Sequence, residues 1–123
     1  MSRPKTRKEL GYSLENCVAD HFFTVGYDKA RRSKGSGNRG ELGDISGVQD
    51  FVVECKRRTT KNITIQEAVW KKLCNEIPLH SRRKPLYILE NMNKKFWAVL
   101  EMNDFFELLK GYLENEKRKE TEV

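Results

Sequence analysis

The sequence predicts a single α/β domain whose helices and strands follow the order α-β-β-β-α-β-β-α. Three observations lead to this prediction. In three segments apolar residues recur every three or four positions, which is the period of an α-helix. Between them lie short runs rich in β-branched and aromatic residues, separated by turns that contain glycine or asparagine. The length of 123 residues is that of one domain, 1–123, with a modest core.

The first half of the chain is expected to hold a basic arm at 1–6, one helix and three strands. A helix over 7–25 would bury one apolar stripe and end at Gly26. The stripe consists of Leu10, Leu14, Cys17, Val18, Phe22 and Val25. Strands are expected at 27–33, 44–46 and 51–56, with a turn at 47–50 joining the last two.

The second half is expected to hold two helices around a β-hairpin. The helix over 64–77 would begin at a capping box of Thr64 and Glu67. The hairpin strands are expected at 85–90 and 96–102, and the final helix would be capped by Asn103 or Asp104. This helix is expected to bury Phe105, Leu108, Leu109, Tyr112 and Leu113. Residues 115–123 are expected to be a flexible tail.

The charge is uneven along the chain. The net charge is +6, but from Glu101 onward four Lys/Arg face seven Asp/Glu, a net of −3, so residues 1–100 carry +9. Such a surplus indicates a polyanionic partner, either nucleic acid or an anionic membrane surface. No run approaches the roughly 18 apolar residues of a membrane span, and the N-terminus lacks the apolar core of a signal peptide. These patterns favour nucleic acid and a cytoplasmic protein that is not secreted.

Cysteine and histidine usage argues against a zinc site. The three cysteines, Cys17, Cys55 and Cys74, are widely spaced, and there are only two histidines. Reduced thiols packed as small core residues are the expected state. Any bound metal would therefore have oxygen ligands.

The stretch Glu41–Arg58, "ELGDISGVQDFVVECKRR", predicts such a metal site. Side chains alternate along a strand, so Glu54 and Lys56 share one face of an otherwise apolar strand. Asp44, across the turn, can reach the same place, and Glu15 falls at the margin of the stripe of the first helix. Converging carboxylates suit Mg²⁺, with Mn²⁺ able to substitute. The alternative is a cross-charge pair on a solvated strand face.

This set of residues fits phosphodiester hydrolysis. A divalent ion there would neutralise charge that builds on the phosphoryl oxygens and would activate a water molecule. Lys56 would steer or deprotonate that water, because burial and a nearby cation lower the pKa of a lysine.

The pattern Asp44…Glu54-Cys55-Lys56 resembles the signature of the PD-(D/E)XK nuclease superfamily. The likeness is closest to Holliday-junction resolvases of the archaeal type and their bacteriophage relatives. It extends over roughly residues 8–113, through "GYSLENCVADHFFTVGY", "RRSKGSG" and "PLYILE…FWAVLEM". One departure is Gly43, which stands where many members have proline and is expected to be harmless.

The resemblance implies a restriction-endonuclease-like mixed sheet flanked by helices, and a Mg²⁺-dependent endonuclease of DNA recombination and repair. Such an enzyme forms a homodimer and resolves four-way junctions by paired nicks that leave 5′-phosphate ends, in a nucleoid or a virus-infected host cell. The implied metal ligands are Asp44, Glu54 and the backbone carbonyl of Cys55, with Glu15 a direct or water-mediated ligand. Lys56 would position the attacking water.

Basic side chains near this site are the candidate DNA contacts. Cations on mobile segments suit phosphates, whereas the alternative is an ordinary solvated surface. The candidates are Arg31, Arg32, Lys34, Ser36, Arg39, Arg57, Arg58 and Lys61. Ser36 enters through the resemblance. Arg82, Arg83, Lys84 and Gln66 are left open between a binding role and a structural one.

Four aromatic residues are a large apolar set for so small a domain. Some of them are expected at a two-fold interface, with core packing the alternative for each. They are Trp70, Phe96, Trp97 and Phe106. Two further readings of the chain remain open: a nuclease of the same superfamily acting on other branched or duplex DNA, and a non-catalytic DNA-binding module of the same fold.

Overall fold

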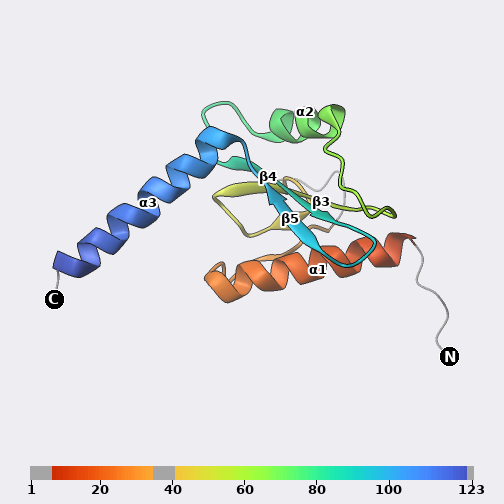
Figure 1. Cartoon of the computed structure of the whole chain (residues 1–123), viewed down its shortest axis with the longest axis horizontal. Coiled ribbons are helices and arrows are strands. Elements are labelled where there is room, and N and C mark those ends of the chain that lie inside the picture. Colours follow the sequence, from red (N-terminus) through yellow and green to blue (C-terminus); the bar gives the residue numbers. More distant parts are fainter. Residues whose placement is uncertain (1–6, 35–40, 122–123) are drawn as a thin grey trace.

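The computed structural model describes residues 7–34 and 41–121, with side chains from Ser13 onward, and forms a three-layer α/β arrangement (Figure 1). A central sheet lies between one helix below it and one above it in this view. The elements follow the predicted order. They are α1 (Arg7–Val25), β1 (Arg31–Arg32), β2 (Ile45–Ser46), β3 (Phe51–Arg57), α2 (Glu67–Glu76), β4 (Lys84–Glu90), β5 (Phe96–Val99) and α3 (Met102–Thr121).

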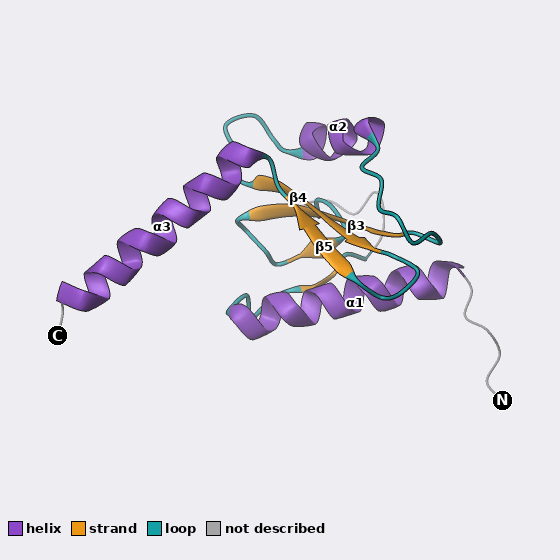
Figure 2. Ribbon diagram, viewed as in Figure 1, coloured by secondary structure: helices purple, strands orange, loops and turns teal. Residues whose placement is uncertain are grey.

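β4 is the central strand of the three-stranded sheet, and β3 and β5 lie on either side of it. β3 pairs in parallel with β4, and α2 forms the crossover between them (Figure 2). β5 returns antiparallel to β4, and β1 pairs antiparallel with β2 in a separate two-stranded sheet. On the other side of β3, the Asp44 N–H donates to the Val53 carbonyl at 2.7 Å. The prediction that β3 is buried is confirmed, but its predicted central position is wrong, because β3 is the outer strand of the sheet order β3-β4-β5.

The alternation of side chains along β3 divides the core between the two faces of the sheet. Val53 and Cys55 face α1 and belong to a cluster that includes Leu14, while Val52 faces α2 and packs with Leu73. β4 is divided in the same way, with Tyr87 fully buried on the α2 side. β3 is therefore buried on both faces, as its apolar sequence indicates.

Several element boundaries differ from those predicted. α1 has the predicted bounds, but Val25 at its end is 75% exposed and lies outside the buried stripe. β1 is only two residues long, and β5 ends at Val99 rather than at residue 102. The stretch 27–30 before β1 forms turns, so the expected strand shrinks to the two residues that face β2.

The predicted capping box of α2 is wrong. The helix begins at Glu67, and Gln66 is the N-cap, with no hydrogen bond from its side chain. Ile63 packs into the core on the α2 side, and this anchor keeps Thr64 outside the helix. Gln66 is exposed, which agrees with a structural position at the start of the helix.

α3 differs most from expectation. Its cap is Glu101, whose carboxylate accepts hydrogen bonds from the N–H groups of Asn103 at 2.9 Å and Asp104 at 3.3 Å. The helix also continues to Thr121 instead of ending near residue 114. It buries no residue, although the sequence predicted five buried side chains. These five are 37–60% exposed: Phe105, Leu108, Leu109, Tyr112 and Leu113.

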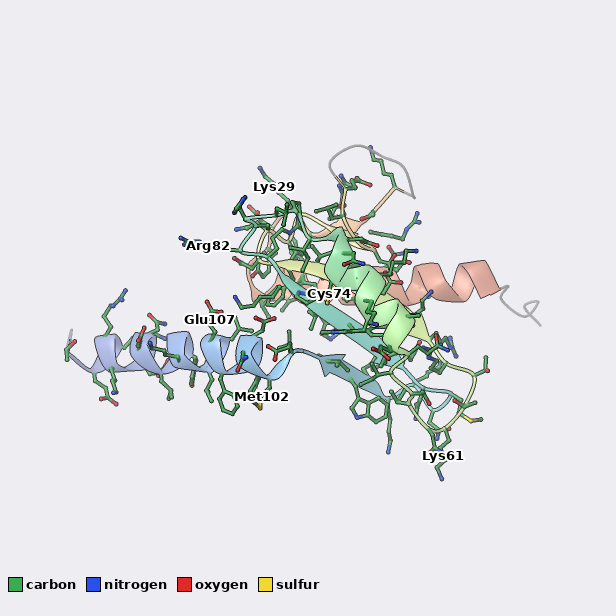
Figure 3. All side chains as sticks on the ribbon, turned by 90° about the horizontal axis from the view of Figure 1, so that it is seen from above. Lys29, Lys61, Cys74, Arg82, Met102 and Glu107 are labelled. Carbon is green, nitrogen blue, oxygen red and sulfur yellow. The ribbon has the colours of Figure 1, made fainter. Side chains whose placement is uncertain are left out.

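The physical reason is that α3 extends beyond the body of the molecule (Figures 1 and 2). Seen from above, α2 with Cys74 lies across the sheet, while α3, marked by Met102 and Glu107, runs away from it (Figure 3). An ion pair of 3.1 Å between Lys84 and Glu107 ties its beginning to β4. Periodicity showed an apolar stripe, but none of residues 7–34 and 41–121 covers it.

All three cysteines are free thiols, as predicted. Among the parts of the chain that the structure describes, no helix is long and apolar enough to cross a bilayer.

Candidate active site

The candidate site lies along the edge of β3, beside the point where β2 begins. Glu54 and Lys56 project from the same face of β3, and Lys56 Nζ lies 3.7 Å from Glu54 Oε1. The Glu54 side chain is 19% exposed and that of Lys56 is 45% exposed. The pair therefore stands at the boundary between core and solvent, where charges remain accessible to a ligand but are only partly screened by water.

Asp44 is fixed to this edge by two hydrogen bonds to β3. Its backbone N–H donates to the Val53 carbonyl, and its carboxylate Oδ2 accepts the backbone N–H of Cys55 at 2.7 Å. The side chain thus takes the place of a neighbouring strand at this position of the ladder. The prediction that Asp44 reaches the vicinity of Glu54 is confirmed.

Gly43 makes this close approach possible. Its φ is +70°, and a Cβ atom there would lie 2.5 Å from the Val53 carbonyl oxygen, so only glycine fits without strain. Its N–H donates to Glu76 Oε2 of α2 at 3.1 Å. Proline fixes φ near −65°, so a proline could not adopt this backbone. A proline in place of Gly43 would therefore disturb the path of this chain into Asp44.

Three acidic side chains repel one another around Asp44. Burial and, to a smaller extent, the negative charge of Asp44 raise the pKa of Glu15 to about 7. Burial likewise raises the pKa of Glu54 to about 7, again with a contribution from Asp44. The pKa of Asp44 is raised by burial, against the lowering effect of its hydrogen bond from Cys55. Asp44 is thus the member that interacts with both of the others.

Cations partly balance this negative charge. The ammonium of Lys56 lowers the pKa of all three carboxyls, so its positive charge acts on Glu15, Asp44 and Glu54 alike. Lys72 of α2 acts on Asp44 and Glu54, and Arg32 acts on Glu15. The pKa values of the three carboxyls nevertheless remain raised, so these cations only partly offset the effects of burial and of the neighbouring negative charges.

The donor set fits a divalent cation with oxygen ligands. Three carboxyls with raised pKa values repel one another less when a cation stands between them, and Mg²⁺ prefers carboxylate and carbonyl oxygens. In the present rotamers, no three His, Cys, Asp or Glu side chains within the described parts of the chain converge on one point. Half-exposed Glu15 and Glu54 would have to rotate inward to share an ion with Asp44, which their exposure permits.

Sequence analysis missed one acidic and one basic residue at this site. Glu76 accepts the Gly43 N–H and raises the pKa of Glu54, while Lys72 lowers it. They stand four apart on α2, next to the buried Leu73. Their spacing on one face of a predicted helix was the available signal, but nothing in the sequence showed that this face borders Asp44.

Two of the predicted DNA-contacting side chains already have internal partners. Arg57 Nε lies 3.7 Å from Glu90 Oε1, and Arg58 Nη2 donates to the Tyr87 hydroxyl at 3.1 Å. Arg58 Nε is buried with no hydrogen-bond partner in the structure. Lys61 is exposed at the far end of the chain segment that follows β3 (Figure 3). This segment remains a candidate surface for phosphate contacts.

The basic residues before the glycine-rich loop cluster with one acidic partner. Arg31 Nη2 pairs with Glu41 Oε1 at 2.6 Å, and Glu41 Oε2 accepts the backbone N–H of Lys34 at 2.7 Å. Arg32 is half-buried towards Glu15. The predicted contacts Ser36 and Arg39 lie outside the described residues.

The structure gives different environments to the three basic residues whose roles the sequence left open, Arg82, Arg83 and Lys84. Arg83 is structural, because its guanidinium donates to the carbonyls of Val48 and Phe51 and so closes the turn before β3. Lys84 is 15% exposed and pairs with α3, whereas Arg82 is exposed.

Comparisons with known proteins supply no relative. The chain has no significant match to any protein-family model, to any curated protein or to any solved structure.

Proposed function

We propose that this protein is a Mg²⁺-dependent endonuclease that cuts DNA at the edge of β3. One observation carries the proposal: Asp44, Glu54 and Glu15 form a half-buried acidic cluster with Lys56 beside it, at the edge of β3. A cluster of like charges is costly to the folded state and is retained where it has a ligand to bind.

Asp44, Glu54 and the backbone carbonyl of Cys55 would hold the ion, with Glu15 as a direct or water-mediated ligand. When bound, Mg²⁺, or Mn²⁺ in its place, supplies positive charge to the phosphoryl oxygens and acidifies the attacking water. The hydrogen bond from Cys55 N–H to Asp44 Oδ2 holds that carboxylate in a fixed rotamer. Preorganisation of this kind lowers the cost of reorganising charge during the reaction.

Lys56 is the residue that would act on the nucleophile. Its Nζ is half-exposed and 3.7 Å from Glu54, so it can donate a hydrogen bond to a water molecule beside the same carboxylate. The ammonium would orient the water towards the phosphorus and would stabilise the negative charge that develops on the phosphate.

The charge distribution and the sequence pattern suggest which substrate to test first. Residues 1–100 carry +9, which favours a polyanion, and Lys61 and Arg82 are exposed cations. The sequence resemblance to junction resolvases makes four-way DNA the proposed substrate. Paired nicks on opposite strands require two active sites, so the proposal includes a homodimer.

The test is cleavage of end-labelled four-way, three-way and linear DNA, with Mg²⁺ or with EDTA. We expect symmetric paired nicks in the four-way DNA that require Mg²⁺ and leave 5′-phosphate ends. Asp44→Asn should abolish cleavage, while Asp28→Asn, the same change at an exposed turn, should leave it intact.

Each other result selects a different function. Cleavage of flaps or linear duplex with the same Mg²⁺ and Asp44 dependence would keep the nuclease and replace the substrate. DNA binding without cleavage, unchanged by Asp44→Asn, would identify a non-catalytic DNA-binding module and would contradict the proposal.

A further inference from the structure

α3 presents an apolar stripe that no other described part of the chain covers. Phe105, Leu109 and Tyr112 follow the i, i+4, i+7 spacing of one helix face and are 48%, 37% and 60% exposed. α3 makes at most marginal contact with the other described helices and strands. A solvated stripe of this length is characteristic of a surface that binds a partner.

The same chain also has an apolar groove without an occupant. A cavity of about 440 Å³ lies between the C-terminal half of α1 and the edge strand β5. Its apolar wall includes Val18, Phe22, Val25, Phe96, Trp97 and Ala98. Three of these residues are at least 42% exposed: Val25 at 75%, Phe96 at 50% and Trp97 at 42%. A groove with such a lining is suited to the apolar face of a helix.

The helix cannot readily reach this groove in its own chain. α3 starts beyond the end of β5, is tied to β4 through Lys84 and Glu107, and extends away from α1 (Figures 1 and 2). Its 20 residues span about 30 Å. It thus projects like an arm, with its apolar stripe available to another molecule.

We propose that α3 of one copy docks into the groove between α1 and β5 of a second copy, and that the second copy reciprocates. The inference deepens the proposed function and rests on it for the expectation of two paired active sites. Residues 101–123 carry −3 and residues 1–100 carry +9, so an exchanged arm meets a body of opposite charge. A two-fold exchange covers both stripes and both grooves in one closed dimer, with no apolar surface of this kind left over.

The first test measures mass in solution across a dilution series, by light scattering or sedimentation. The full chain should have about twice the monomer mass of 14.4 kDa. Leu109→Asp should raise the dimer dissociation constant roughly tenfold or more, as expected for an anchor at the centre of an interface. Leu79→Asp is the matched control, because Leu79 is 91% exposed on the loop between α2 and β4 and should leave the mass unchanged.

A complementation test identifies the surface that receives the helix. Ala98→Asp places a charge in the groove and should dissociate the dimer as Leu109→Asp does, with circular dichroism confirming that both variants are folded. Mixed together, the two variants retain one intact helix and one intact groove, so the mixture should recover a heterodimer that neither variant forms alone.

Three outcomes would overturn the proposal: a monomer at every concentration, a dimer unaffected by Leu109→Asp, or a dimer that tolerates Ala98→Asp because two α3 helices pair directly. Mass and cleavage are read separately, so the fate of the nuclease proposal is distinguishable. A dimer with these properties that cuts no DNA would refute catalysis and leave the exchanged arm standing.

Discussion

The edge of β3 and the surface of α3 depart from ordinary burial in opposite directions. At the edge of β3, Glu15, Asp44 and Glu54 are charged groups drawn into partial burial. On α3, Phe105 and Leu109 are apolar groups left in solvent. Sequences that fold well avoid both situations except where a ligand or partner compensates.

The difference between the two regions shows how each would be completed. The Asp44 carboxylate at β3 is held by a hydrogen bond from the Cys55 N–H, so the fold fixes this group before any ligand binds. α3 has almost no tertiary contacts, so its placement depends on what it meets. One region is preorganised for a small cation, whereas the other is an arm that awaits a large apolar partner.

The largest expected effect is at Lys56. Lys56→Gln should lower the rate of DNA cleavage about 10²–10³-fold, since a positioned donor near the reacting phosphate contributes on that order. Binding of DNA in EDTA should change little. Lys71→Gln, which removes an exposed lysine from an i,i+4 pair on α2, is the control and should cleave normally. Equal activity in the two variants would remove Lys56 from the site.

The next effect tests whether Gly43 fixes the site. Gly43→Ala should destabilise the protein by about 3 kcal/mol, because it combines a positive φ with a clash against β3. Gly26→Ala is the matched comparison: its φ is also positive, at +127°, but no atom lies within 4 Å of the added Cβ. Chemical denaturation should show a clearly smaller loss for Gly26→Ala. Similar losses of stability in the two variants would mean that the contact of the added Cβ atom with β3 contributes nothing to the effect of Gly43→Ala.

The acidic cluster predicts an unusual dependence of stability on pH. The folded-state pKa values of Glu15 and Glu54, about 7, exceed the ordinary value of 4.5, so the folded state binds extra protons between those limits. Stability from these groups is therefore complete below about pH 4.5 and is lost as the pH rises through about 7. In metal-free buffer at pH 8, Glu54→Gln should stabilise the protein, by on the order of 1–3 kcal/mol.

Thermal unfolding of the wild type, Glu54→Gln and the exposed control Glu67→Gln at pH 5 and pH 8 measures this effect. Added Mg²⁺ should raise the wild-type Tm at pH 8 and should do so less for Glu54→Gln. Parallel pH profiles for all three proteins would contradict the raised pKa of Glu54.

The smallest effect concerns the link between α3 and the sheet. Glu107→Gln removes the ion pair with Lys84, in which Glu107 is 68% exposed. Such pairs contribute under about 1 kcal/mol, so the Tm should barely fall. A large loss of stability would show that α3 is an integral part of the body rather than an arm, and would weaken its contrast with the edge of β3.

Much of the fold was predictable because it depends on local patterns. The order of elements and the bounds of α1 follow from apolar period and glycine punctuation, and both are confirmed. The alternation in "FVVECK" predicted which side chains of β3 share a face, and the two core clusters agree. The cap of α2 was wrong because packing of Ile63 outweighed the local capping signal.

The candidate site was only partly predictable. Asp44, Glu54 and Lys56 were identified because a charged pair interrupts an apolar strand beside a turn, and the contacts of Asp44 agree. Glu76 and Lys72 were not, since their place at the site depends on how α2 crosses over β3. The value of Gly43 was also misjudged, because its φ and its distance to Val53 are properties of the folded backbone.

By itself, the sequence determined the alternating faces of β3, the amphipathic stripes of the helices and the opposite charges of body and tail. These depend on the fixed geometry of strands and helices and on simple composition. Only the tertiary structure decided that Glu15 and Glu54 both act on Asp44, and that the stripe of α3 faces solvent. A period reveals that an apolar face exists, but whether the same chain covers it depends on contacts between residues that are distant in sequence.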